Sequence, residues 1–306
     1  MPAQRRFEMD HEHYDWSPIS TRDILRWPEE APLALVVVVN LEHMEWDAPD
    51  GSYQAANLAG GSTARPFPDY ARISHREYGH RVGIFRVLNV LQKYSITPTL
   101  AVDALTARHY PYLMHYCLNR GVEFMAHGIS VSQMITSNMS ADQELKYIQE
   151  TMAAIKIATG TDPVGWLGPE YGESERTPQL LAKSNIKYVC DWANDEQPYP
   201  LKSPEGELTA LPIMLELDDV IAMAHRRVNV DRYANMLTES CDVLYENGSD
   251  NGRLLVLNLH PWLIGQPFRI NYLDEALSTI MNKPLIWAAT GSEVTNWYRG
   301  HNKQRG

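Results

Sequence analysis

The chain has 306 residues, of which 44% are hydrophobic and 21% charged, and its formal net charge is -11. This ordinary globular composition excludes collagen, coiled coils and wholly disordered chains, and the length allows one large domain or two smaller ones. General binders of nucleic acid or membrane surfaces need clustered cations, whereas the basic residues here form only isolated pairs such as Arg5-Arg6. We therefore expect neither nucleic acid nor a membrane as a partner.

Cysteine usage and the N-terminus indicate a cytoplasmic chain. The three cysteines, Cys117, Cys190 and Cys241, show no C-x-x-C spacing, so neither a disulfide framework nor a cysteine zinc site is expected. The N-terminus lacks the apolar core and cleavage site of a signal peptide. The longest unbroken apolar run, residues 34–39, is far shorter than the roughly 20 residues that span a membrane.

Strand-like and helix-like segments alternate from residue 33 onward. The first is a β-branched apolar run, which predicts a strand buried on both faces. A capping box, Ser140 to Gln143, opens a long helix that Gly160 ends. Strands are expected at residues 33–40, 98–102, 122–127, 165–168, 187–192, 211–215, 253–260 and 285–289, and helices at 83–94, 104–119, 140–159, from 177, at 230–246, 272–281 and from 292.

This alternation predicts an α/β fold with a parallel sheet. Seven or eight units without a break in composition favour a single (β/α) barrel domain over residues 1–306, with residues 1–30 as an N-terminal covering segment. Two long segments, residues 42–76 and 193–208, are expected to be irregular. Loops of this length are usually functional or form contacts between subunits.

Polar and titratable residues follow most of the expected strands. In a parallel barrel these positions meet at one rim, where active sites lie. Each has a simpler interpretation when taken alone, since an aspartate such as Asp103 often caps the next helix. Several together are harder to dismiss, because burying many carboxylates without a purpose is costly. The set is Asn40, Glu42, Asp103, His127, Glu170, Asp191, Asp195, Glu196, Glu216, Asp218, Asp219 and His260.

Other chemistries receive little support. The sequence has no dinucleotide-binding glycine motif after the first strand, no phosphate-binding loop and no G-x-S-x-G elbow. Cys190 lies within an expected strand, where a structural role is favoured. The arginines Arg76, Arg81 and Arg86 surround a helix start. They could bind an anionic substrate, but a salt-bridged subunit contact or a solvated face is favoured.

Six collinear segments resemble the polysaccharide deacetylase (NodB-homology) superfamily, and within it the branch of metal-independent allantoinases and cyclic imide hydrolases. The resemblance runs roughly from Trp27 to Trp297. It implies a deformed barrel of seven parallel strands and hydrolysis of a carbon–nitrogen bond other than a peptide bond. The segments are residues 36–42 (VVVVNLE), 77–88 (EYGHRVGIFRVL), 121–128 (GVEFMAHG), 159–174 (TGTDPVGWLGPEYGES), 188–199 (YVCDWANDEQPY) and 257–269 (LNLHPWLIGQPFR).

Three motifs depart from the metal-dependent deacetylases, which hold a divalent metal with one Asp and two His. The metal Asp motif reads Asn40-Leu41-Glu42, and the His pair reads His127 followed by Val131. The arginine motif reads Gly168 to Gly172, without an arginine. These departures fit the allantoinase-like branch. The loops at residues 129–134 and 168–174 differ from the allantoinases themselves, so the resemblance predicts the reaction class rather than allantoin as substrate.

The resulting hypothesis is water attack on a ring carbonyl of a small cyclic amide, imide or ureide without a cofactor. Glu42 or Asp195 would orient or deprotonate the water, and His127 and His260 would polarise the carbonyl and protonate the leaving nitrogen. Asn40 would help to hold the oxyanion or would bridge neighbouring strand ends. The expected substrate-binding residues are Asn40, Glu170, Tyr171, Asp191, Trp192 and Arg81.

Two alternatives stay open. The first is a metal-dependent N-deacetylase of an acetylated sugar or amine, with Glu42, His127 and His260 as candidate zinc ligands. The second is an inactive member of the fold that binds a small molecule. Because related hydrolases form dimers or tetramers, a homo-oligomer is expected.

Overall fold

A sheet of nine strands forms the centre of the part of the chain that the computed structural model describes, residues 11–47, 49–50, 52 and 68–303. Its order is β6-β7-β5-β4-β3-β2-β1-β8, and β9 pairs with the beginning of β1. All pairings are parallel except that of β6 with β7. The strands are β1 (Leu33–Leu41), β2 (Thr99–Val102), β3 (Glu123–Ala126), β4 (Gly165–Trp166), β5 (Tyr188–Val189), β6 (Tyr199–Leu201), β7 (Leu208–Ala210), β8 (Arg253–Leu259) and β9 (Ile286–Ala288).

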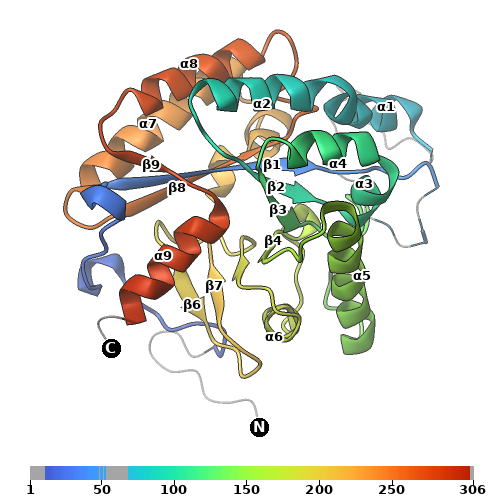
Figure 1. The fold of residues 1–306 in the computed structure, drawn as a ribbon, viewed down its shortest axis with the longest axis horizontal. Coiled ribbons are helices and arrows are strands. Elements are labelled where there is room, and N and C mark those ends of the chain that lie inside the picture. Colours follow the sequence, from blue (N-terminus) through green and yellow to red (C-terminus); the bar gives the residue numbers. More distant parts are fainter. Residues whose placement is uncertain (1–10, 48, 51, 53–67, 304–306) are drawn as a thin grey trace.

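Helices connect and cover these strands. The sheet curls into a half-barrel, and Figure 1 shows α2, α7 and α8 lying side by side along β1 and β8. The helices are α1 (Tyr70–Tyr78), α2 (Ile84–Lys93), α3 (Ala104–His109), α4 (Pro111–Leu118), α5 (Ala141–Thr159), α6 (Thr177–Lys183), α7 (Val230–Gly248), α8 (Ile270–Met281) and α9 (Gly291–Lys303). None of those described is long and apolar enough to cross a membrane.

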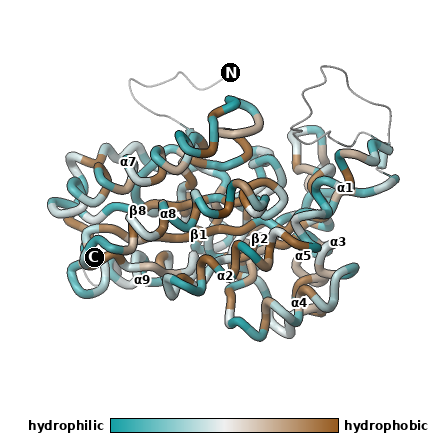
Figure 2. The backbone as a smooth tube through the Cα atoms, turned by 90° about the horizontal axis from the view of Figure 1, so that it is seen from above, coloured by the Kyte–Doolittle hydropathy of each residue, from teal (hydrophilic) through white to brown (hydrophobic). Residues whose placement is uncertain are grey.

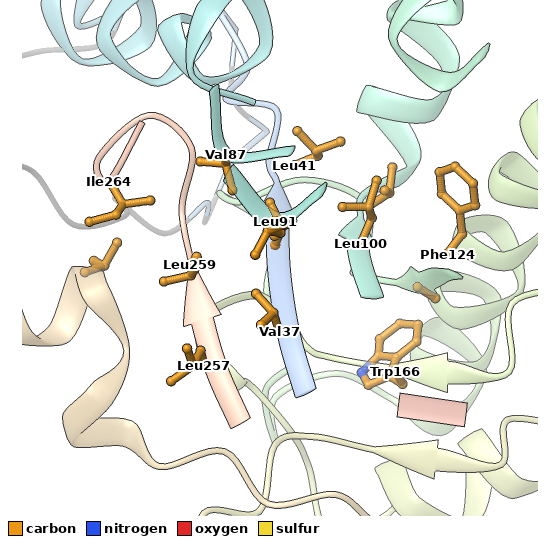
Figure 3. Packing of buried hydrophobic residues seen from close by; sticks show 14 of the residues in the cluster. Val37, Leu41, Val87, Leu91, Leu100, Phe124, Trp166, Leu257, Leu259 and Ile264 are labelled. Atoms are coloured by element: carbon orange, nitrogen blue, oxygen red, sulfur yellow. The ribbon is translucent and has the colours of Figure 1, made fainter. Parts of the chain in front are cut away.

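The two faces of β1 belong to two different cores. Odd-numbered residues such as Val37 and Leu41 pack against Val87 and Leu91 of α2 and against β8 (Figure 3), in the larger hydrophobic cluster. Even-numbered residues from Ala34 to Val38 point into the barrel and join a smaller cluster. Because successive side chains of a strand point to opposite faces, both faces are apolar. Figure 2 accordingly shows β1 as a hydrophobic stretch through the middle of the molecule.

The same alternation explains where the polar residues lie. On β1 and β8, every second residue points into the barrel, and most of these residues are apolar. The inward-pointing residues that follow the last apolar one are polar and lie at the open end of the barrel. Asn40 and Glu42 extend the series of β1, and Asn258 and His260 extend that of β8. Leu41 and Leu259, between them, face the helices instead (Figure 3). The alternation of side chains along the strands therefore places these polar residues at one site.

The structure confirms the deformed (β/α) barrel and the capping box at the start of α5, with Gly160 in the left-handed conformation after its end. The strand expected at residues 211–215 is wrong. The segment expected to be irregular instead forms the antiparallel pair β6–β7, and β7 is the strand that joins the sheet beside β5. Its short strands, each of three residues, give too weak an alternation for the sequence to reveal.

The N-terminal segment lies against the other end of the barrel. Trp27 is buried and its indole donates to Arg253 O at the start of β8. The Gly252 amide donates to Leu25 O, and the Leu25 amide donates to the side chain of Asn251. Residues 11–30 therefore cover the rim opposite the polar side chains, while residues 1–10 lie outside the described residues.

Candidate active site

Glu42 is the centre of the polar cluster at the open end of the barrel. Its side chain is almost fully buried, and Oε2 accepts a hydrogen bond of 2.6 Å from Nη1 of Arg76. The other oxygen, Oε1, lies 3.3 Å from Nε2 of His127 and 3.9 Å from Nε2 of His260. One carboxylate thus joins a guanidinium on one side and two imidazoles on the other.

His260 is held by a carboxylate. Its Nδ1 lies 2.6 Å from Oδ1 of Asp219, whose Oδ2 accepts from the backbone amide of His260. The carboxylate cannot donate when ionised, so Nδ1 carries a proton and Nε2 faces Glu42. Burial lowers the pKa of His260, but the charges of Asp219 and Glu42 outweigh burial and raise this pKa to about 9. His260 is therefore a cation near neutral pH.

His127 is held by a peptide group instead. Its Nδ1 donates to Leu167 O over 2.6 Å, so Nδ1 again carries the proton. Its Nε2 points to Glu42. The described carboxylates make no direct hydrogen bond to Nδ1 of His127. The two histidines therefore present the same nitrogen to the same oxygen, with different supports behind them.

Glu42 is ionised near neutral pH. Burial would raise the pKa of Glu42, but Arg76, followed by His260 and His127, lowers it well below its ordinary value. The pKa of Asp219 shifts in the opposite direction. Burial raises it to about 6, although the charge of His260 opposes the shift. Between about pH 6 and 9, the pair of Asp219 and His260 thus consists of a carboxylate and an imidazolium.

Close backbone packing brings Arg76 to Glu42. Arg76 lies near the end of α1, which continues into the π-helical turn η3 (Gly79–Gly83). A Cβ added to Gly83 would lie 2.0 Å from Pro261 O, and one added to Gly79 would lie 2.9 Å from the Trp262 amide. Only glycine permits this contact with the loop after β8. The approach also sets Arg76 over the Trp262 ring, 4.8 Å from its centroid.

A second buried network of hydrogen bonds lies next to this cluster, two residues before Glu42 on β1 and two before His260 on β8. The Asn40 amide donates to Asn258 Oδ1 and to Leu259 O, which ties the end of β1 to the end of β8. Asn258 in turn donates to Asp218 Oδ2, which also accepts from the Tyr171 hydroxyl over 2.6 Å. Asn40 and Tyr171, expected to bind substrate, are therefore bonded within the protein. For Asn40 this is the strand-bridging role.

Glu170 reaches the site from the turn after β4. Glu170 and Tyr171 both adopt left-handed backbone angles, with φ of 53° and 57°. Such angles are costly for residues other than glycine, and they concentrate at functional sites. Burial and the charge of Glu42 raise the pKa of Glu170, while Arg76 and His260 lower it. The carboxyl group of Glu170 therefore interacts electrostatically with the cluster, although it makes no hydrogen bond to the described residues.

Three of the expected site residues lie elsewhere. Asp195 pairs with Arg22 of the N-terminal segment over 2.5 Å. The neighbouring Glu196 carbonyl accepts from Leu254, which pairs with Ala34, six residues or roughly 20 Å before Asn40 along β1. Asp195 is thus at the opposite rim, away from Glu42. Arg81 is exposed on η3, and Trp192 packs against His13 and Tyr14.

Two other strand-end aspartates lie behind the site. Asp103 is fully buried, and its carboxylate accepts from the amides of Thr106 and His43. It caps α3, as the simpler interpretation of the sequence predicted. Asp191 accepts from the amide of Gly168, next to the carbonyl that holds His127.

The residues present do not fit a divalent metal at the position used by the metal-dependent deacetylases. The guanidinium of Arg76 already neutralises Glu42, and the cationic His260 lies beside it. Val131, where those enzymes have the second histidine, is an apolar buried residue. A second candidate set among the described residues, Asp218, Asp219 and His260, lies within 4.8 Å. Its oxygens already accept hydrogen bonds from His260, Tyr171, Asn258 and two backbone amides.

Residues 77–189 match the family model described as polysaccharide deacetylase. This confirms the resemblance read from the sequence. The matched range includes η3, β2 to β5 and His127, whereas β1 and β8 lie outside it.

Two curated relatives are described as deacetylases. A putative polysaccharide deacetylase of Schizosaccharomyces pombe is 24% identical over 299 residues, which covers 90% of this chain and 93% of the relative. The peptidoglycan deacetylase of Helicobacter pylori is 31% identical over 160 residues, which covers 52% of this chain and 54% of the relative.

Solved structures share the fold across nearly the whole chain. The PuuE allantoinase superposes with a TM-score of 0.82 at 23% identity, covering 92% of this chain and 95% of that chain. A probable polysaccharide deacetylase from Pseudomonas aeruginosa PAO1 gives 0.79 at 23% identity, covering 90% and 94%. At these identities the likeness shows the fold.

The sequence missed the partners of the central residues. The sequence favours a solvated face or a subunit contact for Arg76, whereas the structure buries it against Glu42. Asp219 was noted at a strand end but not assigned to His260. A helix that bends at η3 and a loop that turns back over β8 bring these pairs together, and neither contact leaves a sequence pattern. The nearest signal for Arg76 was Gly79 and Gly83, four residues apart.

Proposed function

We propose that the chain is an amidohydrolase that opens a small cyclic amide, imide or ureide by attack of water on a ring carbonyl. The observation that carries this proposal is the convergence of His127 Nε2 and His260 Nε2 on one oxygen of Glu42. Hydrolysis of a carbon–nitrogen bond needs one group to take a proton from water and another to give a proton to the leaving nitrogen. The likeness in fold to PuuE allantoinase supports this reaction class.

His260 is the proton donor in this proposal. Its pKa of about 9 means that both ring nitrogens carry protons at neutral pH. Nδ1–H is bonded to Asp219, which leaves Nε2–H for the substrate. A cationic donor beside the carbonyl also stabilises the negative charge that develops on oxygen during attack.

His127 is the proton acceptor. Its Nδ1–H is bonded to Leu167 O, so a proton taken from a water molecule would go to Nε2. Glu42, with its strongly lowered pKa, is a weak base. Its role is to orient the water and to balance the charge of the imidazolium that forms at His127.

The proposed step conserves atoms and charge. The water oxygen bonds to the ring carbonyl carbon as His127 Nε2 takes one proton. The carbon–nitrogen bond then breaks, its electron pair stays on nitrogen, and His260 Nε2 gives that nitrogen a proton. The product is a ring-opened carboxylic acid or carbamate with a free nitrogen. Proton exchange with water then restores His127 and His260 to their starting protonation states.

The charges around the cluster favour a neutral substrate. Glu42 and Asp219 balance Arg76 and His260, so the cluster has no net charge to offer an anion. Glu170, with its raised pKa and no described partner, can accept an N–H of the substrate ring or donate to its carbonyl. Ring amides and ureides offer both groups.

A metal-dependent N-deacetylase is the alternative. The family match, the two deacetylase relatives and the set of Asp218, Asp219 and His260 favour it. The two functions differ in their response to metal removal. We expect protein purified without added ions to hydrolyse a cyclic amide, imide or ureide at the same rate before and after chelation. Near-stoichiometric zinc, with activity lost on chelation and restored by zinc, would overturn the proposal.

The decisive experiment is turnover of a panel of cyclic amides, imides, ureides and acetylated amines by the wild type and two variants. We expect His127→Ala and Glu42→Gln to abolish turnover of the accepted ring substrate while their circular dichroism spectra stay close to that of the wild type. Glu42→Gln should also unfold at a lower temperature, because it removes the buried charge that pairs with Arg76. Full activity in either variant would contradict the assignment. Tight binding of one ligand with no turnover by the wild type would favour the inactive alternative.

A further inference from the structure

One peptide group connects His127 to a carboxylate. The carbonyl of Leu167 accepts from Nδ1 of His127 over 2.6 Å, and the amide of Gly168 donates to Oδ1 of Asp191 over 2.8 Å. These two atoms belong to the same peptide bond, between residues 167 and 168. The order is therefore carboxylate, peptide group, imidazole, with a hydrogen bond at each junction.

Such a chain transmits charge. A carboxylate bonded to the N–H of an amide pushes electron density toward its carbonyl oxygen, and linked hydrogen bonds strengthen one another in this way. The carbonyl of Leu167 is consequently a stronger acceptor for the proton on Nδ1 of His127. The effect resembles the direct bond from Asp219 to His260 but is weaker, because one peptide group lies between the charge and the ring.

Space at Gly168 allows this arrangement. A Cβ at that position would lie 2.8 Å from Gly172 O and 3.1 Å from Oδ2 of Asp191. Any larger residue would push the Asp191 carboxylate away from the amide. The glycine that replaces the arginine of the metal-dependent deacetylases thus leaves room for a carboxylate to bind the backbone directly.

The second oxygen of Asp191 meets another carboxyl group. Oδ2 of Asp191 and Oε1 of Glu173 are both buried, and neither accepts from a donor among the described residues. The two side chains are hydrogen-bond partners of each other. Two carboxyl groups can bond only if they share a proton. Burial and the charge of Asp191 raise the pKa of Glu173 well above its ordinary value, and burial also raises the pKa of Asp191, to about 7. Because the larger rise is on Glu173, the shared proton lies on Glu173 and the negative charge on Asp191.

The surroundings keep the charge on this pair. His127 is the cation-forming group that faces Asp191, while Tyr147 and Cys190 are neutral neighbours whose own pKa values are raised. Glu144 of α5 faces Glu173 and is itself bonded to Ser174 and Thr177. No described lysine or arginine pairs with either member. Asp191 therefore directs its charge at the peptide group and, through it, at His127.

We propose that Asp191, acting through the peptide group of Leu167 and Gly168, is a positioning residue that keeps the proton on Nδ1 of His127, and that Glu173 supports it by sharing a proton. This inference rests on the proposed function for its kinetic consequence, but not for its structural one. The tautomer of His127 exists whether or not the hydrolysed substrate is a cyclic amide.

The test compares Asp191→Asn with a matched control, Glu123→Gln. Glu123 begins the strand that ends before His127 and bonds to Thr99, Tyr188 and Ser292 at the other rim. In ¹⁵N-labelled protein, the wild type and Glu123→Gln should show His127 protonated at Nδ1, and Asp191→Asn should show a mixture of tautomers. We expect kcat of Asp191→Asn to fall about tenfold or more with KM nearly unchanged, because a wrongly placed ring proton impairs the base.

A second pair of variants covers the case in which Asp191→Asn does not fold. Glu173→Gln can still donate to Oδ2 of Asp191, so it should keep the wild-type tautomer and kcat. Glu173→Ala removes the shared proton, forces Asp191 to take a proton itself, and should shift the tautomer as Asp191→Asn does. Wild-type ring signals in Asp191→Asn and Glu173→Ala would overturn the inference. A shifted tautomer in a protein that opens no cyclic substrate would instead refute only the proposed function.

Discussion

His127 and His260 face the same oxygen of Glu42 but differ in the group that is hydrogen-bonded to Nδ1 of the ring. Asp219 bonds directly to Nδ1 of His260, and a peptide carbonyl bonds to Nδ1 of His127. A full negative charge behind a ring stabilises its cation, whereas a dipole fixes its tautomer and stabilises the cation less. In the proposed reaction, this difference gives two identical side chains beside one carboxylate opposite roles, acid and base.

The largest expected effect comes from removing either ring. His127→Gln and His260→Gln should each lower kcat by about 10²- to 10⁴-fold, the usual contribution of one acid or base. Their residual pH profiles should differ. The wild type should lose activity as the pH rises through about 9, where His260 deprotonates. This alkaline limb should persist in His127→Gln and disappear in His260→Gln. Steady-state rates from pH 5 to 10 test this, and identical residual profiles would contradict separate roles.

Arg76 should dominate the stability of the site. Arg76→Met leaves the Glu42 carboxylate buried without its closest cation, a change that typically costs about 3–5 kcal/mol of unfolding free energy. The lowered pKa of Glu42 implies that this stabilisation is present above the ordinary pKa of a glutamate and is lost as the pH falls below it. Urea unfolding at pH 7 measures the loss. Arg81→Met, on the exposed face of η3, is the control and should change stability by less than about 0.5 kcal/mol.

Asp219 tests whether charge behind the ring makes His260 an acid. Without that charge, burial lowers the pKa of His260, so Asp219→Asn should move the alkaline limb to lower pH and cost about ten- to a hundredfold in kcat at pH 8. The sign for stability follows from the raised pKa. The wild type gains stability from His260 below about pH 6.5, its unfolded pKa, and loses this gain as the pH rises to about 9. Asp219→Asn should flatten that loss. An alkaline limb that stays near pH 9 would show that Asp219 does not set the pKa.

Much of this arrangement follows from the two-residue period of β-strands, which can be recognised in the sequence. The apolar run from Leu33 to Val39 predicts β1, and its inward series predicts that Glu42 lies at the barrel mouth with His127 and His260. The partners of these residues are another matter. Arg76 reaches Glu42 because η3 packs on the loop after β8, a contact between segments about 180 residues apart. Such contacts depend on three-dimensional packing and leave only weak local signals.

Asp195 follows an expected strand but does not lie with the other strand-end residues. β5 is only two residues long, and the chain after it leaves the barrel mouth for the opposite rim, where Glu196 bonds to the first residues of β8. A residue six positions after such a short strand has no fixed relation to the strand's end. The sequence therefore overestimated how many carboxylates surround His127 and His260.

Asp195 also gives the smallest expected effect, and the one that separates the two rims most simply. Its partner Arg22 and its own side chain retain 17% and 12% of their exposure, so the ion pair should contribute no more than about 1 kcal/mol to stability. Asp195→Asn should leave kcat and its pH profile at wild-type values, because the carboxylate contacts Arg22 and the amides of Glu196 and Gln197 rather than Glu42. Kinetics and thermal unfolding of one purified variant measure both quantities. A tenfold loss of kcat with unchanged melting would return Asp195 to the catalytic set and would mean that the N-terminal segment moves during turnover, because the carboxylate cannot otherwise reach the histidines.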